Sequence, residues 1–316
     1  MTSIILLRAI RKAKNLLAPG KNFAFDTPTV DFSGQAASNL ISQLLTAESP
    51  AMIARFGYGE IRCVYNYVTQ PSLQNIKRYI NGEIISLGWE KDRARSMSVN
   101  AGFFPANISN FEKFSQLMIQ EMKQVDILGS WLPEEHIFHE ELSLAKKVKL
   151  SDLEPYYHQD PWTNVLKGKK ILVVHPFEES IRRQYKKRKY LFKDERILPE
   201  FDLKVVKAVQ SIANNNVIYK NWFEALDSMK EKIIKEDFDI ALIGCGAYGF
   251  PLAGFVKSIG KKSVHIGGAV QVIFGIKGAR WDDKKFFQSL YNEHWIRPVQ
   301  NDFPENYQQV EGGCYW

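Results

Sequence analysis

The sequence predicts an α/β fold in which helices cover both faces of a Rossmann-like, mostly parallel sheet. Short apolar runs alternate with helical patterns from residue 35 onwards. Most of these runs are apolar throughout, as expected of strands that are buried on both faces. The chain has 316 residues, 45% of them hydrophobic, and is long enough to build the core of such a fold.

In the first half, residues 34–48 predict a helix that leads into a strand over 51–57, and residues 125–131 predict the next strand. Helical patterns broken by glycine and proline lie between these strands. The segment 132–168 is rich in charged, proline and aromatic residues. It predicts a connector with short helices, and it is the place where the main domain, residues 35–316, would divide.

The second half alternates more regularly. Asn221, followed three residues later by Glu224, predicts the N-cap of one of its helices. The predicted strands are 167–177, 201–211, 238–246 and 261–269, and the predicted helices are 179–192, 221–237, 250–260 and 270–276. Ligands of parallel sheets bind at the carboxyl ends of the strands, so the residues directly after each strand are the candidate site residues.

Both ends of the chain depart from this alternation. Residues 281–316 are rich in aromatic residues, and we expect them to pack across the domain, with the ligand cleft as one place that they would cover. Residues 1–20 predict a basic, amphipathic helix that would lie on an anionic membrane, or pack on its own domain or on a second subunit. Its apolar arc consists of Ile5, Leu6, Ala9, Ile10, Ala13, Leu16 and Leu17, and the cations Arg8, Arg11, Lys12 and Lys14 lie on the other arc.

The composition limits partners and location. A net charge of +7 favours anionic partners such as phosphates or anionic lipids. The sequence contains no nucleic-acid-binding module, so nucleic acid is not an expected partner. Cys63, Cys245 and Cys314 are far apart, which argues against a disulfide framework and favours the reducing cytoplasm. No apolar run approaches the roughly 20 residues of a transmembrane helix, so any membrane contact would be peripheral, on the inner face of the cytoplasmic membrane.

Gly244, Gly246 and Gly249 stand between a predicted strand and a predicted helix with the spacing of a dinucleotide-binding turn. Such a turn brings the backbone close to a phosphate, and the helix after it offers free N–H groups. NAD also requires an acidic residue about 20 positions further on, at the end of the next strand. His265 stands there instead. The motif therefore predicts a phosphate or nucleotide site rather than an NAD site, with a turn formed only for packing as the alternative.

Several cationic and titratable residues follow predicted strands. His175 and His265 are candidate general bases, with a structural role as the alternative for each. Lys277 and Arg280 would bind phosphate or would be solvated. The basic run 182–189 is either a solvated helix face or a site for phosphate or a lipid headgroup.

The segment IARFGYGEIRCV, residues 53–64, contains an arginine, two glycines and a carboxylate just after the first predicted strand. Arg55, Gly57 and Gly59 would bind a phosphate through the guanidinium and the backbone. Glu60 adds a carboxylate for a metal ion or for acid–base chemistry. This segment and residues 241–281 together resemble bacterial glycosyltransferases of the GT-D fold type, which act in surface-polysaccharide and glycoprotein assembly.

The resemblance implies a Rossmann-like sheet, a nucleotide-sugar donor and transfer of the sugar to a hydroxyl of a glycan or lipid-linked glycan. In the family, a strand-end Arg-Phe-Gly-Asp-Gly-Glu carries an Asp-x-Glu pair for a divalent metal, Mn or Mg, and for the donor diphosphate. Glu60 matches the glutamate as metal ligand or catalytic carboxylate, whereas Tyr58 replaces the aspartate. Arg55, Gly57 and Tyr58 would form one wall of the donor site, opposite the Gly244–Gly249 turn.

The missing aspartate leaves two ways to neutralise a diphosphate. Asp282 or Asp283 would supply the second carboxylate for a metal, or Arg55, Lys277 and Arg280 would act without metal. Two other functions also fit the sequence. One is an NAD(P)-dependent or nucleotide-sugar modifying Rossmann enzyme, and the other is a non-catalytic, membrane-associated assembly protein.

Overall fold

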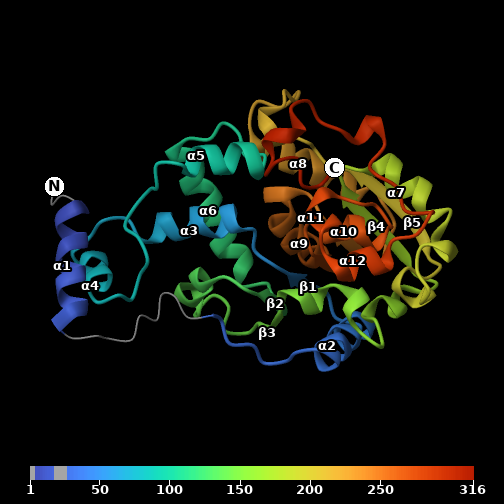
Figure 1. Ribbon diagram of the computed structural model, residues 1–316, viewed down its shortest axis with the longest axis horizontal. Coiled ribbons are helices and arrows are strands. Elements are labelled where there is room, and N and C mark those ends of the chain that lie inside the picture. Colours follow the sequence, from blue (N-terminus) through green and yellow to red (C-terminus); the bar gives the residue numbers. More distant parts are fainter. Residues whose placement is uncertain (1–3, 18–26) are drawn as a thin grey trace.

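The computed structural model describes residues 4–17 and 27–316. Within these residues, seven strands form one parallel sheet in the order β3-β2-β1-β7-β6-β4-β5 (Figure 1). The strands are β1 (Ala51–Ala54), β2 (Ile127–Ser130), β3 (Lys146–Lys149), β4 (Lys170–His175), β5 (Asp202–Lys207), β6 (Ile240–Ile243) and β7 (Lys262–His265). The predicted α/β fold with a parallel sheet is therefore confirmed.

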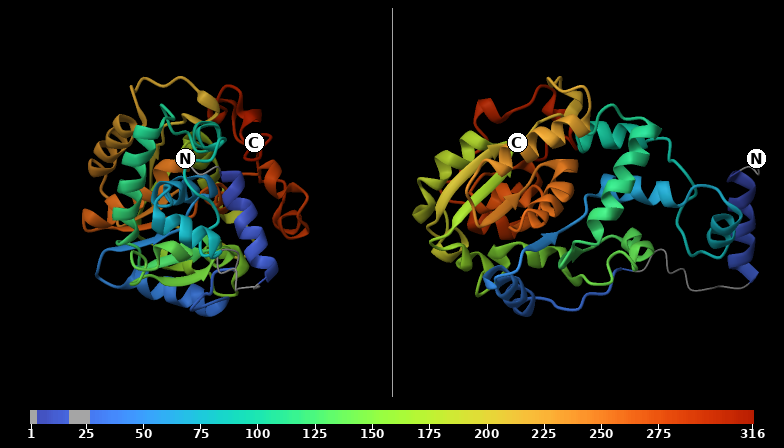
Figure 2. Two further views of the ribbon diagram at one scale, coloured as in Figure 1. Left: turned by 90° about the vertical axis from the view of Figure 1, so that its left-hand side faces the viewer. Right: turned by 180° about the vertical axis from the view of Figure 1, so that it is seen from behind.

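Helices surround the sheet on both faces and extend beyond it at one end of the molecule (Figure 2). They are α1 (Ile4–Leu17), α2 (Gln35–Thr46), α3 (Tyr58–Val68), α4 (Leu73–Ile80), α5 (Arg93–Arg95), α6 (Ile108–Met122), α7 (Glu178–Tyr185), α8 (Trp222–Ile234), α9 (Gly249–Ser258), α10 (Ala269–Ile273), α11 (Ala279–Asp282) and α12 (Lys285–Leu290). The rest of the predicted N-terminal helix, residues 1–3 and 18–20, lies outside the described residues.

The core has two layers because alternate side chains of each strand point to opposite faces. Met52 and Ala54 of β1 belong to the layer that α3, α6, α8 and α9 complete. Ile53 belongs to the layer that α2, α7, α10 and the C-terminal segment complete. Strands buried on both faces explain why the sequence shows continuous apolar runs rather than alternation.

The chain leaves the carboxyl edge of the sheet towards alternate faces. β1 and β6 are followed by α3 and α9 in one layer, whereas β7 and β4 are followed by α10 and α7 in the other. These four strands are neighbours in the order β1-β7-β6-β4. Chains that depart in opposite directions from adjacent strands open a crevice between them, which is where ligands of such sheets bind.

Two elements differ from the prediction. β3 was not predicted, because it is an edge strand of sequence KKVK in which only Val148 is buried. The predicted helix 179–192 ends at Tyr185. The run Lys186–Lys189 follows, and in a continued helix Lys186 and Lys187 would lie four residues after Arg182 and Arg183, where like charges repel.

The N-cap prediction for α8 is correct. Asn221 Oδ1 accepts a hydrogen bond from the backbone N–H of Glu224 at 3.0 Å. The Glu224 carboxylate accepts from the N–H of Lys220 at 2.7 Å, one residue before the position that a reciprocal capping box uses.

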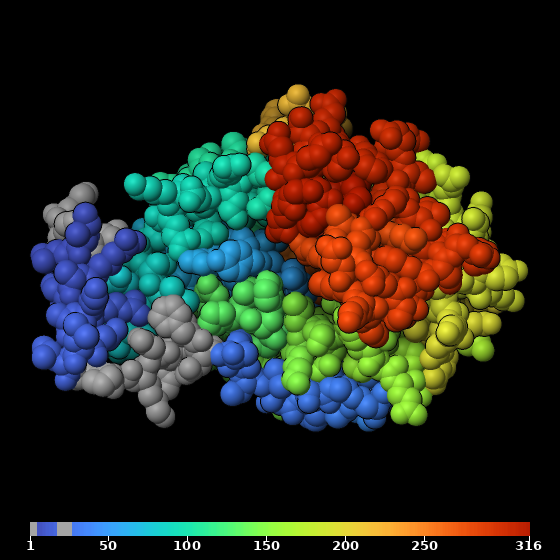
Figure 3. Space-filling view, viewed as in Figure 1, coloured from blue at the N-terminus to red at the C-terminus, as the bar shows by residue number. Residues whose placement is uncertain are grey.

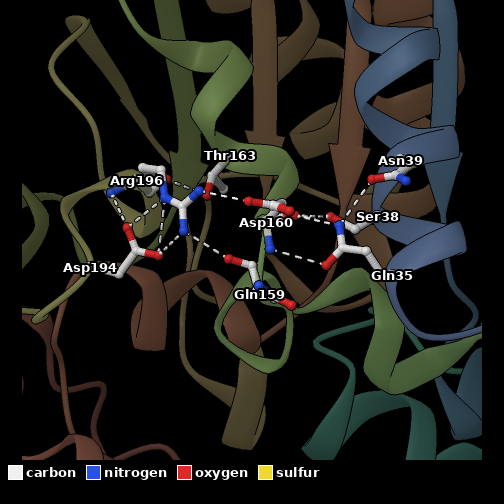
Figure 4. Close-up of polar contacts among 8 residues, drawn as sticks. All are labelled: Gln35, Ser38, Asn39, Gln159, Asp160, Thr163, Asp194 and Arg196. Carbon is white, nitrogen blue, oxygen red and sulfur yellow. Dashed lines mark hydrogen bonds and ion pairs between the residues drawn. The ribbon is translucent and has the colours of Figure 1, made fainter.

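The connector 132–168 is fixed to α2 by a polar network (Figure 4). The backbone carbonyl of Asp160 accepts hydrogen bonds from Gln35 Nε2 at 2.9 Å and Ser38 Oγ at 2.7 Å. The Asp160 carboxylate pairs with Arg196 at 2.7 Å. The connector also contributes β3 to the sheet. The strands before and after it thus share one sheet.

Candidate functional site

The crevice at the carboxyl edge contains two neighbouring pockets. The Arg55 pocket encloses about 750 Å³, including its open mouth, and is lined by Arg55, Gly57, Tyr58, Gly59, Glu60, Ser96, Trp131, His265, Gly267, Arg280 and Glu311. The His175 pocket encloses about 590 Å³ and is lined by His175, Phe177, Gln210, Ser211, Gly244, Tyr248, Gln271 and Trp316. Asn100, Ala101, Gly246, Gly268 and Tyr315 line both. The two pockets therefore share one wall and lie side by side along the crevice, from the end of β1 to the end of β4.

The structure brings most of the predicted site residues into this crevice. Arg55 and Glu60, from the end of β1 and the start of α3, share a pocket with His265 at the end of β7. Gly244 and His175 lie in the adjoining pocket. Gly249 and Lys277 line neither of the two pockets. Lys277 instead lies 4.9 Å from the ring centroid of Tyr291.

Arg55 forms no ion pair within 4 Å among the described residues. Its Nε is buried and has no hydrogen-bond partner among the described residues. Its Cζ lies 5.3 Å from the ring centroid of Trp131, whose indole N–H is fixed by the Phe56 carbonyl at 3.1 Å. Burial lowers the pKa of Arg55, and the charge of Glu60 opposes that shift. An arginine nevertheless stays protonated in proteins, so the Arg55 pocket favours an anionic ligand.

Glu60 reaches the pocket because of Gly57. Gly57 is the N-cap of α3, and a Cβ at this position would overlap the Glu60 carboxylate. Only glycine leaves room for the carboxylate to fold back over the first turn of α3. Burial raises the pKa of Glu60, and hydrogen bonding to its own backbone N–H and the charge of Arg55 only partly oppose the shift. A carboxylate with a raised pKa is the better proton acceptor near neutral pH.

The two histidines present opposite ring atoms for hydrogen bonding. His265 Nδ1 lies 3.1 Å from the carbonyl of Ile243, which only accepts, so Nδ1 carries the proton and Nε2 keeps a lone pair. His175 Nδ1 accepts from the N–H of Phe177 at 3.0 Å, so its proton is on Nε2. His265 can therefore accept a hydrogen bond from a ligand, whereas His175 can donate one.

Both histidines are neutral at physiological pH. Burial lowers the pKa of His175 to about 3. Burial, reinforced by the charge of Arg55, lowers the pKa of His265 to about 3 as well. A histidine base would have to take up a proton against this shift, whereas the pKa of Glu60 is shifted in the direction that favours proton uptake.

The glycine motif is explained mainly by contacts within the protein. A Cβ on Gly244 would overlap the carbonyl oxygen of Gly267, and one on Gly249 would overlap the ring of His265. Gly246 has a φ of +56°, and a Cβ there would lie 2.9 Å from the carbonyl oxygen of Ala101. The packing interpretation therefore accounts for Gly249. Gly244 and Gly246 are also closely packed, but they line the pockets, so a role in ligand binding remains compatible with their positions.

We expect Gly249→Ala to destabilise the protein, because the new methyl group must displace His265 or α9. Overpacking of this kind lowers the free energy of unfolding by about 1–3 kcal/mol. Gly59→Ala is the matched control, since its Cβ would meet only the flexible side chains of Ser96, at 3.2 Å from Oγ, and Met97, at 3.9 Å from Sδ. Thermal unfolding of both variants tests the interpretation, and a Gly249→Ala protein as stable as the control would contradict it.

The C-terminal segment lines the crevice, which is the place that the sequence suggested it would cover. Arg280 stacks on Tyr315, with Cζ 4.6 Å from the ring centroid, and contacts the carboxylate of Glu311. Tyr315 lies between the two pockets, and Trp316 lines the second. Sequence reasoning missed Trp131, Glu311 and Tyr315 as site residues. The aromatic richness of residues 281–316 was the one available signal for the last of these.

The carboxylates do not fit a resident divalent metal. The described residues contain no group of three or more His, Cys, Asp and Glu side chains that could hold a metal ion. Asp282 contacts Arg297 and accepts from the Tyr291 hydroxyl at 3.4 Å, and neither Asp282 nor Asp283 lines the Arg55 pocket. Glu311 is already engaged by Arg280. Arg280 is engaged by the same contact, whereas Arg55 Nε has no hydrogen-bond partner among the described residues.

No protein-family model and no curated protein matches the chain. Two solved structures are similar to it. One is described as the selenomethionine-substituted structure of domain of unknown function 1792, with a TM-score of 0.43 and 13% identity over 96% of this chain and 98% of that one. The other is described as domain of unknown function 1792 with a distinct glycosyltransferase fold, with a TM-score of 0.36, 13% identity and the same two coverages.

Proposed function

We propose that the protein is a glycosyltransferase that moves a sugar from a nucleotide-diphosphate sugar to a hydroxyl of a glycan or lipid-linked glycan. One observation carries the proposal. Arg55, a cation with an unpartnered Nε, lies in the same pocket as Glu60, a carboxylate whose pKa is raised. The pair supplies what the reaction needs, namely a positive charge for a departing diphosphate and a base for an attacking hydroxyl.

In the proposed reaction, Arg55 binds the donor diphosphate, and Arg280 joins it by leaving its contact with Glu311. Glu60 removes the proton of the acceptor hydroxyl while its oxygen forms a bond to the anomeric carbon of the donor sugar. The bond from that carbon to the diphosphate breaks, and the diphosphate leaves with the electron pair. His265 Nε2 accepts a hydrogen bond from a sugar hydroxyl. Trp131 and Tyr315 offer flat surfaces for the sugar and the nucleobase.

The setting belongs to the proposal as well. The family resemblance favours bacterial surface glycan assembly, with the enzyme in the cytoplasm. The NAD alternative gains no support from the structure, because the strand that should end in an acidic residue, β7, ends at His265.

A thermal-shift screen tests the proposal. UDP-, GDP- and TDP-sugars are each measured with Mn²⁺ and with EDTA, and the controls are NAD and a CMP-sugar, which carries only one phosphate. We expect one class of donor to stabilise the protein, equally in both buffers, since arginines rather than a metal neutralise the diphosphate. Stabilisation that disappears with EDTA would show that donor binding requires a divalent metal. Stabilisation by none of the donors, or by NAD alone, would contradict the proposal.

A further inference from the structure

Helix α1 does not pack its apolar arc against the rest of the domain, as an amphipathic helix usually does. Leu7, at 5% exposure, is the one buried side chain among residues 5–17. It joins a small cluster with Tyr79 of α4 and Ile84. Leu7 does not belong to the apolar arc of the sequence pattern. Leu6, Leu16 and Leu17, which do, are 52%, 77% and 87% exposed.

Polar contacts hold α1 in this orientation. Arg11 donates to the carbonyl of Ile84 at 3.1 Å, and its Cζ lies 4.8 Å from the ring centroid of Tyr79. Lys14 contacts the side chain of Asn81. Cations of α1 thus anchor the helix to the domain. A helix that served only to complete the core would bury its apolar arc instead.

Helix α1 lies at the end of the molecule that is far from the sheet (Figures 2 and 3), and its apolar arc is exposed there. Arg8 and Lys12 are exposed along one border of the arc, and α1 contains no acidic residue. Next to α1, helix α4 adds Leu73, which is 91% exposed, and the exposed Lys77. The acidic residue beside them, Glu83, contacts Arg78 and Asn81. We call the exposed arc of α1, together with Leu73 and Lys77 of α4, the α1/α4 surface.

We propose that the α1/α4 surface docks on an anionic lipid bilayer. The leucines would enter the boundary between headgroups and acyl chains, and Arg8, Lys12 and Lys77 would meet lipid phosphates. A second copy of the chain fits less well, because two such surfaces would bring like charges together. None of the described helices is long and apolar enough to cross a membrane. The contact is therefore peripheral, and it does not depend on the activity proposed above.

Sedimentation of the full-length protein with vesicles tests the docking. The probes are phosphatidylcholine vesicles with and without phosphatidylglycerol. We expect binding to the anionic vesicles only, reduced by added salt because the headgroup contacts are screened. The double variant Leu16→Glu/Leu17→Glu should lose about 100-fold or more in vesicle affinity, since each leucine contributes about tenfold when it is buried. Leu144→Glu, which changes an equally exposed leucine on the connector, is the matched control.

Three results would overturn the docking. They are equal binding by the double variant and the wild type, no binding of the wild type to anionic vesicles, and a wild-type dimer that the double variant converts to a monomer. The last result would identify a second copy as the occupant. Because neither leucine lies in the crevice, the thermal shift with a donor should be the same in the double variant. A failure of the docking is thus separable from a failure of the proposed function.

Discussion

Replacing Glu60 with glutamine is expected to lower the rate of sugar transfer by about 10²–10⁴-fold, the contribution that a positioned general base makes. Glutamine fills nearly the same volume over Gly57 but cannot take the proton of the acceptor hydroxyl. Donor affinity should change little, because the arginines that are proposed to bind the diphosphate are untouched. Release of nucleotide, measured with the donor that the thermal-shift screen identifies, gives the rate.

The matched control is Glu112→Gln, which changes an exposed carboxylate on α6 that lines neither pocket. Its activity should equal that of the wild type. Full activity of Glu60→Gln would contradict the role of Glu60 as base. Loss of activity together with loss of the donor-induced thermal shift would show that Glu60 binds the donor rather than acting on the acceptor.

The raised pKa of Glu60 adds a pH signature to the same variant. Activity of the wild type should fall as the pH drops through this pKa, because the protonated carboxyl cannot act as a base. Stability changes in the opposite direction. The ionised carboxylate is less favourable in the pocket than in the unfolded chain, so wild-type stability declines from the unfolded pKa, about 4.3, up to the raised folded value. Glu60→Gln should therefore unfold at a higher temperature than the wild type above this range and at the same temperature below it.

Much of the crevice could be predicted from the sequence because strand ends carry a local signal. An apolar run followed by glycine, arginine or histidine marks the carboxyl end of a buried strand, and parallel strands bring such ends to one edge. This logic placed Arg55, Glu60 and His265 in one pocket. The roles of the histidines were not predictable, because the tautomer of each depends on one backbone contact in the folded state.

The parts that were missed depend on contacts between distant segments. Trp131 enters the pocket because its indole reaches the carbonyl of Phe56, and Glu311 enters because it contacts Arg280. Neither contact leaves a pattern within a window of the sequence. The orientation of α1 could not be predicted from the sequence for a related reason. The sequence shows which arc of a helix is apolar, but only the partners of Arg11 and Lys14 decide which arc faces the protein.

Replacing Arg55 with methionine is expected to weaken donor binding by about 10- to 150-fold for each charge-assisted hydrogen bond to the diphosphate that is lost. Methionine preserves most of the packing against Trp131 while it removes the charge. The donor affinity of Arg55→Lys should lie between those of the wild type and Arg55→Met, since lysine restores the charge but not the bidentate geometry of a guanidinium. Calorimetric titration with the donor measures the affinity of the wild type and of both variants. Arg183→Met, at an exposed arginine of α7, is the matched control and should bind as the wild type does.

The free protein should respond to Arg55→Met in a way that a purely structural arginine would not produce. The charge of Arg55 contributes to the low pKa of His265, so its removal should raise that pKa from about 3. Proton NMR of the His265 ring detects the change without any ligand. Burial of the Arg55 cation also costs free energy in the protein without donor, so the variant should unfold at a higher temperature than the wild type. Weaker donor binding combined with a more stable free protein identifies Arg55 as a ligand-binding group. A less stable variant that binds the donor normally would show that the arginine supports the fold instead.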